Sequence, residues 1–380
     1  MASLAFEPHW INTNQLLAEV CQSWLQEAYL AVDTEFVRTT TFYPKAGLIQ
    51  VTSSVADYLI DPLEISDWQP LRQVFEHPLV VKVFHACAED LEVCRQLIGC
   101  VPSPLADSQH AAALCGLGGS MGFQRLVAEV LNVDLAKGET RSNWLERPLR
   151  DEQIQYAVAD VYYLYRLYPK LVAQLKQLGR ESWLAEDCQR LVQQAMAPDD
   201  LAGQYRRVKL AWKLRAQEQF VLQQLVVWRE QRARERDVPR SKVIDDGTLW
   251  NIARYKAKNR DQLARSGMKP GALKQDGKAI LQIVTQALAM DSDHWPRQLD
   301  KPLSPDAGQW LKELKKIINQ RAETLQIPAD LLVRKKTLEA LLRSAYPSGQ
   351  GRLPESLQGW RKTEIGEALL VKLAELNNAA

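Results

Sequence analysis

The sequence predicts an α/β layer fold over residues 1–196, followed by two all-helical domains over 208–292 and 302–380. Three observations support this division. Apolar runs of strand length come first in the chain and helix-periodic segments follow, as in layered α/β folds. Short motifs in the second half recur at one fixed offset, which indicates a duplicated unit. The charge balance also changes sign near residue 200.

Caps, apolar runs and turn residues define the elements of the first domain. Asn12 or Thr13 can cap an opening helix. Predicted strands lie near 29–35, 46–53, 57–60 and 79–84, with Pro44 and Gly47 in the loop between the first two. Predicted helices lie near 68–76 and 88–98, and helical segments then continue to about 195 with breaks at 116–119 and 137–138. Residues 197–200 are expected to form a linker.

Two carboxylates lie side by side at the end of the first long strand. Asp33 and Glu35 close the apolar run of residues 29–32, and side chains two apart on a strand share a face. Their repulsion is costly unless a cation or a proton offsets it. Hard oxygen ligands suit Mg²⁺ or Mn²⁺. Because Asp-x-Glu is common by chance, the pair alone is a weak indication of a metal site.

Further candidate residues stand in suitable positions. Asp90 lies at a strand-to-helix step, and Tyr156 and Asp160 share one face of a helix because they are four residues apart. Each residue alone has an ordinary explanation: a partner of the helix dipole for Asp90, core packing for Tyr156 and a solvated charge for Asp160. Their joint occurrence with Asp33 and Glu35 predicts one metal-dependent site.

These motifs resemble those of the DEDD exonuclease superfamily. They are Asp33-x-Glu35, His85-x4-Asp90 and Tyr156-x3-Asp160, and the tyrosine is typical of the tyrosine subclass. Gln155 stands where the histidine subclass carries its histidine. Flanking segments are similar to the bacterial ribonuclease D family: 34–38, 48–50, 85–93, 106–109, 143–149 and 156–161. The resemblance implies a ribonuclease H-like sheet with the acids clustered at one end.

The resemblance also implies a role for each residue. Asp33 bridges two divalent cations, Mg²⁺ or Mn²⁺. Glu35 and Asp160 complete the site of the ion that activates the attacking water, and Asp90 holds the second ion largely through water. Tyr156 orients the nucleophile, since its pKa near ~10 makes it a poor base. The implied activity is 3′→5′ exoribonuclease action that releases 5′-mononucleotides and trims structured RNAs such as tRNA precursors.

Cysteine, histidine and hydropathy patterns restrict the classes of protein to which the chain can belong. The six cysteines lack C-x-x-C spacing, which predicts reduced, mostly buried thiols of a cytosolic protein. The five histidines are scattered, and His85 is predicted to be structural because the four acids complete the metal set. No apolar run reaches ~18 residues, and the N-terminus lacks the pattern of a signal peptide. We therefore expect a cytoplasmic protein without a membrane partner.

Charge is distributed unevenly along the chain. Residues 1–200 hold 15 Lys and Arg against 26 Asp and Glu, residues 201–290 hold 19 against 8, and residues 291–380 hold 14 against 12. The basic middle region is predicted to bind RNA through phosphate contacts and counterion release. A solvated helical linker is the alternative, but the apolar periodicity of this region argues against it.

The repeat lies in the second half of the chain. Motifs at 231–233, 238–239, 248–249 and 277–281 recur 89 residues later, and Pro239 and Pro328 are expected to change the chain direction. The first copy resembles the HRDC domain, a helical nucleic-acid-binding module found after RecQ helicase and ribonuclease D catalytic domains. The second copy resembles it less clearly, so a packing or spacer role is as well supported as RNA contact.

Two other functions use the same features. A DNA exonuclease of the proofreading or RecQ-associated type would carry the same four acids, because these acids do not read the sugar. The flanking segments favour ribonuclease D. A catalytically silent RNA-binding scaffold is disfavoured by the intact set of five site residues.

Overall fold

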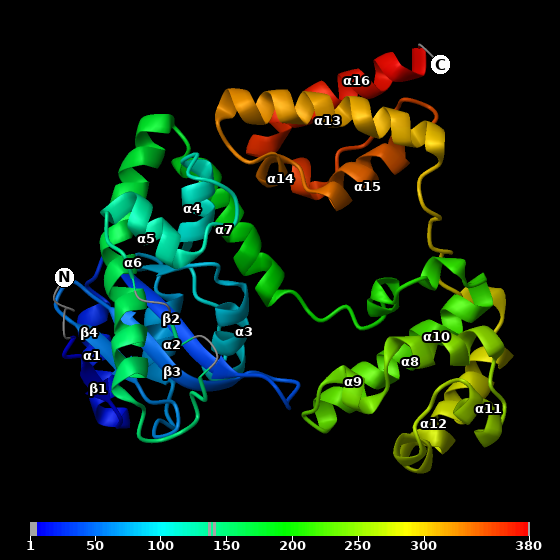
Figure 1. Cartoon of the computed structure of the whole chain (residues 1–380), viewed down its shortest axis with the longest axis horizontal. Helices are drawn as coiled ribbons and strands as arrows, with labels where there is room; N and C mark the ends of the chain where they lie inside the picture. Colours follow the sequence, from blue (N-terminus) through cyan, green and yellow to red (C-terminus); the bar gives the residue numbers. More distant parts are fainter. Residues whose placement is uncertain (1–5, 136–137, 140–141, 379–380) are drawn as a thin grey trace. The chain divides into compact units, whose positions relative to one another are not determined.

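The computed structural model describes residues 6–135, 138–139 and 142–378. The chain forms two compact units (Figure 1). The smaller unit contains Arg38–Pro44 and Pro198–Pro302, and the larger unit contains the rest of the described chain. Residues 303–378 thus share a unit with the α/β region. The division into domains at 1–196, 208–292 and 302–380 remains a prediction.

A mixed six-stranded sheet organises the larger unit. Its order is β1-β4-β3-β2-β5-β6, with β2 antiparallel to β3 and parallel to β5. The strands are β1 (His9–Ile11), β2 (Tyr29–Val37), β3 (Lys45–Thr52), β4 (Asp57–Ile60), β5 (Val81–Phe84) and β6 (Leu105–Asp107). The sequence did not predict β1 and β6, because three residues are too few to show a period.

The carboxylates of β2 lie inside the strand and not at its end. The sequence placed Asp33 and Glu35 at the close of the strand, but pairing with β3 continues to Val37. The register shifts between Glu35 and Phe36. This correction follows from the antiparallel partner, which supplies hydrogen bonds beyond the apolar run that the sequence shows.

Helices cover the sheet of the larger unit. They are α1 (Asn14–Trp24), α2 (Gln69–Glu76), α3 (Ala88–Leu97), α4 (Ser108–Leu114), α5 (Phe123–Leu131), α6 (Asp151–Leu178) and α7 (Glu181–Met196). Of the two candidate caps, Asn12 and Thr13, it is Thr13 that caps α1, since its hydroxyl accepts from the Leu16 amide. The long helix α6 packs against β2, β3, β4 and β5 and crosses the sheet in Figure 1. The helix break expected at 137–138 includes Lys137, which lies outside the described residues.

The second helical copy completes the larger unit. It contains α13 (Pro305–Leu325), α14 (Ala329–Leu332), α15 (Lys335–Ala345) and α16 (Glu367–Asn378). Its buried residues join those of the α/β region in one hydrophobic core. Asp187 of α7 forms a two-pronged ion pair with Arg361 and accepts a hydrogen bond from the Trp360 indole at 3.2 Å. The rings of Trp183 and Trp360 stack at 4.3 Å.

The smaller unit is the first helical copy. It contains α8 (Ala216–Glu235), α9 (Arg240–Val243), α10 (Asp246–Tyr255), α11 (Arg260–Arg265) and α12 (Pro270–Ala289). Its core includes Phe42, from the segment between β2 and β3, whose amide donates to Asp237 at 3.0 Å. The Arg234 and Arg240 guanidinium groups lie 4.5 and 4.7 Å from the centre of the Phe42 ring.

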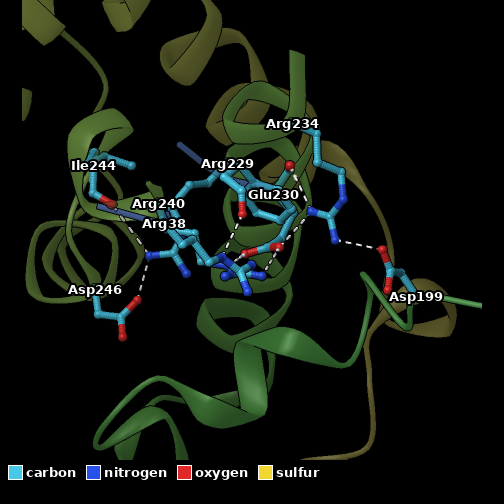
Figure 2. A network of polar contacts seen from close by, with 9 residues as sticks. Arg38, Asp199, Arg229, Glu230, Arg234, Arg240, Ile244 and Asp246 are labelled. Atoms are coloured by element: carbon cyan, nitrogen blue, oxygen red, sulfur yellow. Dashed lines mark hydrogen bonds and ion pairs between the residues drawn. The ribbon is translucent and has the colours of Figure 1, made fainter. Parts of the chain in front are cut away.

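A network of ion pairs surrounds the buried Glu230 in this unit. Glu230 is 1% exposed and accepts from Arg234 at 2.7 Å and from Arg240 at 2.5 and 2.9 Å (Figure 2). Arg234 also pairs with Asp199, and Arg229 pairs with Asp246. These pairs satisfy the charge that burial would otherwise make costly. Part of the basic excess of residues 201–290 is therefore used inside the unit.

Candidate active site

Two elements bring three carboxylates together. Asp33 and Glu35 point to one face of β2, and Asp160 comes from α6, which packs on that strand. One carboxylate oxygen from each of the three lies within 4.8 Å of the others. Such a set of hard oxygen donors fits Mg²⁺ or Mn²⁺. The expected face-sharing of Asp33 with Glu35 is thus confirmed by the geometry.

Asp90 approaches the cluster from a third element. It lies in the first turn of α3 and is 7% exposed. Its carboxylate accepts a hydrogen bond from the Thr34 hydroxyl at 2.5 Å. Asp90 also raises the pKa of Asp33 through charge repulsion. It therefore lies near the three-carboxylate group, although it is not a member of that close set.

Burial raises the pKa values of all four acids, and repulsion from the neighbouring acids raises those of Asp33 and Glu35 further. Burial is the largest cause in each case. The pKa of Glu35 rises to about 9, that of Asp160 to about 7 and that of Asp90 to about 6. The pKa of Asp33 is raised well above its usual value. Without a cation, this cluster retains protons at neutral pH.

Tyr156 is held between the cluster and a loop. Burial raises the pKa of its hydroxyl, and the neighbouring Asp160 and Glu35 charges raise it further. The hydroxyl donates a hydrogen bond to Asp160 and lowers the pKa of that acid. A Cβ on Gly138 would lie 2.1 Å from the Tyr156 ring, so only glycine fits at this contact. Tyr156 thus stays protonated and can act as a hydrogen-bond donor.

Asp107 supports the turn that carries Asp90. It is 1% exposed and accepts from the amides of Ala86 and Cys87, which precede α3, at 3.2 and 2.9 Å. It also caps α4 by accepting from the Gln109 amide at 2.8 Å. Burial opposes ionisation of Asp107, but its interactions with His110 and with Cys87 outweigh burial and lower its pKa. Asp107 lies in the flanking segment 106–109, but its position in the sequence did not indicate this role.

Arg147 fixes the loop that precedes α6. Its guanidinium donates to both oxygens of Asp61 at 2.7 and 2.6 Å and to the Gly47 carbonyl at 2.7 Å. The loop places the buried Trp144 ring 6.2 Å from the ring of Tyr156. The sequence could not assign this role, because Asp61 lies 86 residues away in the chain.

His85 and the cysteines take structural positions. The His85 ring nitrogens lie 2.8 Å from the Ser108 hydroxyl and 3.1 Å from the Met121 carbonyl, and burial lowers the pKa of the ring. All six cysteines are buried and free of disulfide bonds. Each helix in the described ranges is too short or too polar to cross a bilayer.

Family models match all three regions of the chain. A 3′-5′ exonuclease family model matches residues 8–176, an HRDC domain model matches 218–284, and a model of the ribonuclease D C-terminal HRDC domain matches 305–369. The predicted α/β exonuclease fold with helical HRDC domains is thereby confirmed. The third match, over residues 305–369, identifies the more divergent copy as an HRDC domain, a resemblance that was less clear from the sequence.

Relatives match over nearly the whole chain. Ribonuclease D from Pseudomonas paraeruginosa is 46% identical over 365 residues, covering 96% of this chain and 97% of its own. Ribonuclease D from Escherichia coli is 36% identical over 364 residues, covering 94% and 96%.

A solved structure matches to the same extent. The crystal structure of Escherichia coli RNase D, described as an exoribonuclease involved in structured RNA processing, aligns with a TM-score of 0.91 at 35% identity. It covers 97% of this chain and 99% of its own. The chain belongs to the ribonuclease D family and is an exoribonuclease.

Proposed function

We propose that this exoribonuclease removes 5′-mononucleotides one at a time from the 3′ ends of structured RNA, such as tRNA precursors, with two divalent cations. The observation that carries the proposal is the group of three carboxylates from β2 and α6 within 4.8 Å, with Asp90 adjacent. DEDD exonucleases normally use divalent metal ions. The described Escherichia coli relative acts in structured RNA processing.

The side chains divide the work of hydrolysis. When bound, the cations supply activation of water, neutralisation of phosphate charge and stabilisation of the leaving oxygen. Asp33, Glu35 and Asp160 would hold them through carboxylate oxygens, and Asp90 would contribute from α3. Tyr156 would orient the attacking water through its hydroxyl, since its raised pKa excludes the role of base. Thr34 would fix the Asp90 carboxylate.

The first helical copy would anchor the RNA. Exposed basic residues lie on α11, on α12 and just before each of these helices, and we call them the basic patch: Lys258, Arg260, Arg265, Lys269, Lys274 and Lys278. Tyr255, just before the patch, is 71% exposed and offers a ring for stacking. Contacts of these cations with phosphates would give a salt-dependent affinity that does not depend on sequence.

A digestion of a 3′-tailed tRNA precursor tests the proposal. The full chain should shorten the tail stepwise with Mg²⁺ and stop with EDTA, and thin-layer analysis should show 5′-mononucleotides. A matched tail that ends in a 3′-deoxyribose separates an RNA enzyme from a DNA exonuclease, because only the RNA enzyme should discriminate. Equal rates with and without metal, or products longer than one nucleotide, would contradict the mechanism.

A further inference from the structure

A cavity against α6 is lined by tyrosines and cations. It has a volume of about 570 Å³ and lies between α6, the start of β2 and the end of α5. Its polar and aromatic lining residues are Tyr29, Tyr162, Tyr163, Tyr165, Arg166 and Lys170, and we call it the tyrosine pocket. The volume falls within the ~300–1,000 Å³ range of ligand sites. Catalysis as described above does not use these side chains.

The walls of the pocket are suited to nucleobases. Tyr29 and Tyr165 stack with their ring centres 4.4 Å apart, and the Arg166 guanidinium lies 3.3 Å from the centre of the Tyr162 ring. The four tyrosines are only partly buried, which leaves ring surface accessible. Every base has a π face, so such rings bind single strands with little sequence preference.

The charge of the pocket suits a polyanion. Arg166 and Lys170 are exposed, and no acidic residue of the described chain lines the cavity. This is unusual for residues 1–200, which hold 26 acidic against 15 basic residues. A tyrosine cluster that served core packing alone would not require two exposed cations at its mouth. The combination of open rings and cations therefore points to a nucleic-acid strand.

The pocket lies on the same face of the sheet as the carboxylates. Tyr29 and Asp33 are four residues apart on β2, so both side chains point toward α6, and the Tyr29 hydroxyl donates to the Tyr165 carbonyl. Four residues of strand span roughly 13 Å. On α6, Arg166 follows Asp160 by about 9 Å of helix rise. A few nucleotides of a single strand cover such a distance.

We propose that the tyrosine pocket binds bases of the single-stranded RNA tail a few nucleotides upstream of the bond that is cut. Bases stack on the tyrosines, while Arg166 and Lys170 contact the phosphates. This inference rests on the proposed hydrolysis of 3′ tails and adds a reason for the enzyme to act on tails of a minimum length. It also places a binding subsite on the two elements that hold the carboxylates.

The test compares oligoribonucleotides of two to ten nucleotides. The double variant Arg166→Gln, Lys170→Gln changes exposed side chains only and should fold normally. The ratio of its kcat/KM to that of wild type should decrease as the substrate becomes longer. It should be about 10-fold below one for strands long enough to reach the pocket. The effect should lie in KM. Lys176→Gln is the matched control, because Lys176 is exposed on the same helix but does not line the pocket.

A direct readout of stacking completes the test. Oligonucleotides carrying 2-aminopurine at successive positions, bound in EDTA, should lose fluorescence at positions that reach the pocket, and Tyr163→Ala should restore it. A ratio of variant to wild-type kcat/KM that stays constant with length, or quenching that does not depend on position, would overturn the inference. Absence of metal-dependent turnover by the wild type, even on the longest strand, would instead overturn the proposed function.

Discussion

The two helical copies share one framework. Asp237 and Gln326, 89 residues apart, both adopt left-handed φ values, of 47° and 53°. Pro239 and Pro328 then precede the short helices α9 and α14. Gly277 and Gly366 are both buried. Both copies thus share the left-handed residue that follows one helix and the proline that begins the next turn of the chain.

The surfaces of the copies differ systematically. The six residues of the basic patch correspond, at the offset of 89, to Pro347, Gly349, Pro354, Gln358, Thr363 and Glu367. Conversely, Trp360 and Arg361, which contact α7, correspond to Gly271 and Ala272. The first copy carries the exposed cations that we propose to bind RNA, and the second copy carries side chains that contact α7. A duplicated unit can therefore diverge in function through its surface alone.

The largest expected effect separates catalysis from binding. Asp160→Asn removes one of the three clustered carboxylates that we propose to bind metal, so turnover should fall by about 10⁴-fold. Affinity for tRNA-sized RNA should change little, because the basic patch is intact. Single-turnover rates and filter binding at matched Mg²⁺ measure the two quantities. A large loss of affinity in Asp160→Asn would mean that the copies do not carry most of the binding.

The second prediction concerns the anchor of the second copy. Asp187→Ala leaves Arg361 in a nearly buried position without its partner, so the free energy of unfolding should fall by about 3–5 kcal/mol. Gly271→Ala, at the position that matches Trp360, is the control. A Cβ there meets nothing within 4 Å, so the change should stay below about 1 kcal/mol. Equal effects in urea titrations would show that the copies are not differently anchored.

The third prediction uses pH to distinguish the units. In the metal-free protein, Glu35, Asp160 and Asp90 have raised pKa values, so the folded larger unit binds more protons than the unfolded chain. Its stability should fall as pH rises from about 6 to 9, and Mg²⁺ should restore more stability at pH 8.5 than at pH 6.

The smaller unit provides the internal comparison. Burial opposes ionisation of Glu230 and Asp245, but hydrogen bonds outweigh it and lower both pKa values, so these groups stay ionised in this range. Hydrogen exchange across the pH series should show the dependence in the larger unit, second copy included, and not in the smaller unit. The same pH dependence of stability in both units would contradict the proposal that the raised pKa values of the clustered acids cause it.

The smallest expected effect concerns the hydrogen bond that holds Asp90 beside the carboxylate cluster. Thr34→Val keeps the shape of the side chain but removes the hydroxyl that donates to Asp90. We expect turnover to fall about 10-fold at low Mg²⁺ and to recover at high Mg²⁺, because a misplaced ligand weakens metal binding. Thr52→Val is a matched control on β3, where the hydroxyl bonds Asp57 instead. A loss that high Mg²⁺ does not reverse would exclude this role.

Local patterns made much of the site predictable. Asp33 and Glu35 share a strand face, and Tyr156 and Asp160 share a helix face, so their spacing predicts that the two side chains of each pair lie close together, as the structure shows. The sequence also placed α1 and its Thr13 cap correctly. The linker expected at 197–200 coincides with the boundary between Ala197 and Pro198.

Contacts between distant residues were not predictable. Nothing near Asp187 in the sequence indicates that Arg361, 174 residues away, is its partner. Likewise, Arg38–Pro44 reads as a hairpin loop of the sheet but packs in the smaller unit, where Asp237 accepts from the Phe42 amide. Pairings of this kind depend on the folded arrangement of whole elements and leave no periodic pattern in the chain.

The most direct test of the division between the copies is the salt dependence of RNA affinity. A variant with Lys269, Lys274 and Lys278 changed to Gln, Thr and Glu, the residues of the second copy, should bind tRNA-sized RNA more weakly. Its slope of log K against log salt should be smaller by about 3, roughly one for each lost phosphate contact. The reciprocal charge-removing control, Lys335→Gln with Lys336→Gln in the second copy, should leave the slope unchanged. An unchanged slope in the first variant, or an equal decrease of the slope in the control, would contradict the proposal that the first copy carries the phosphate contacts.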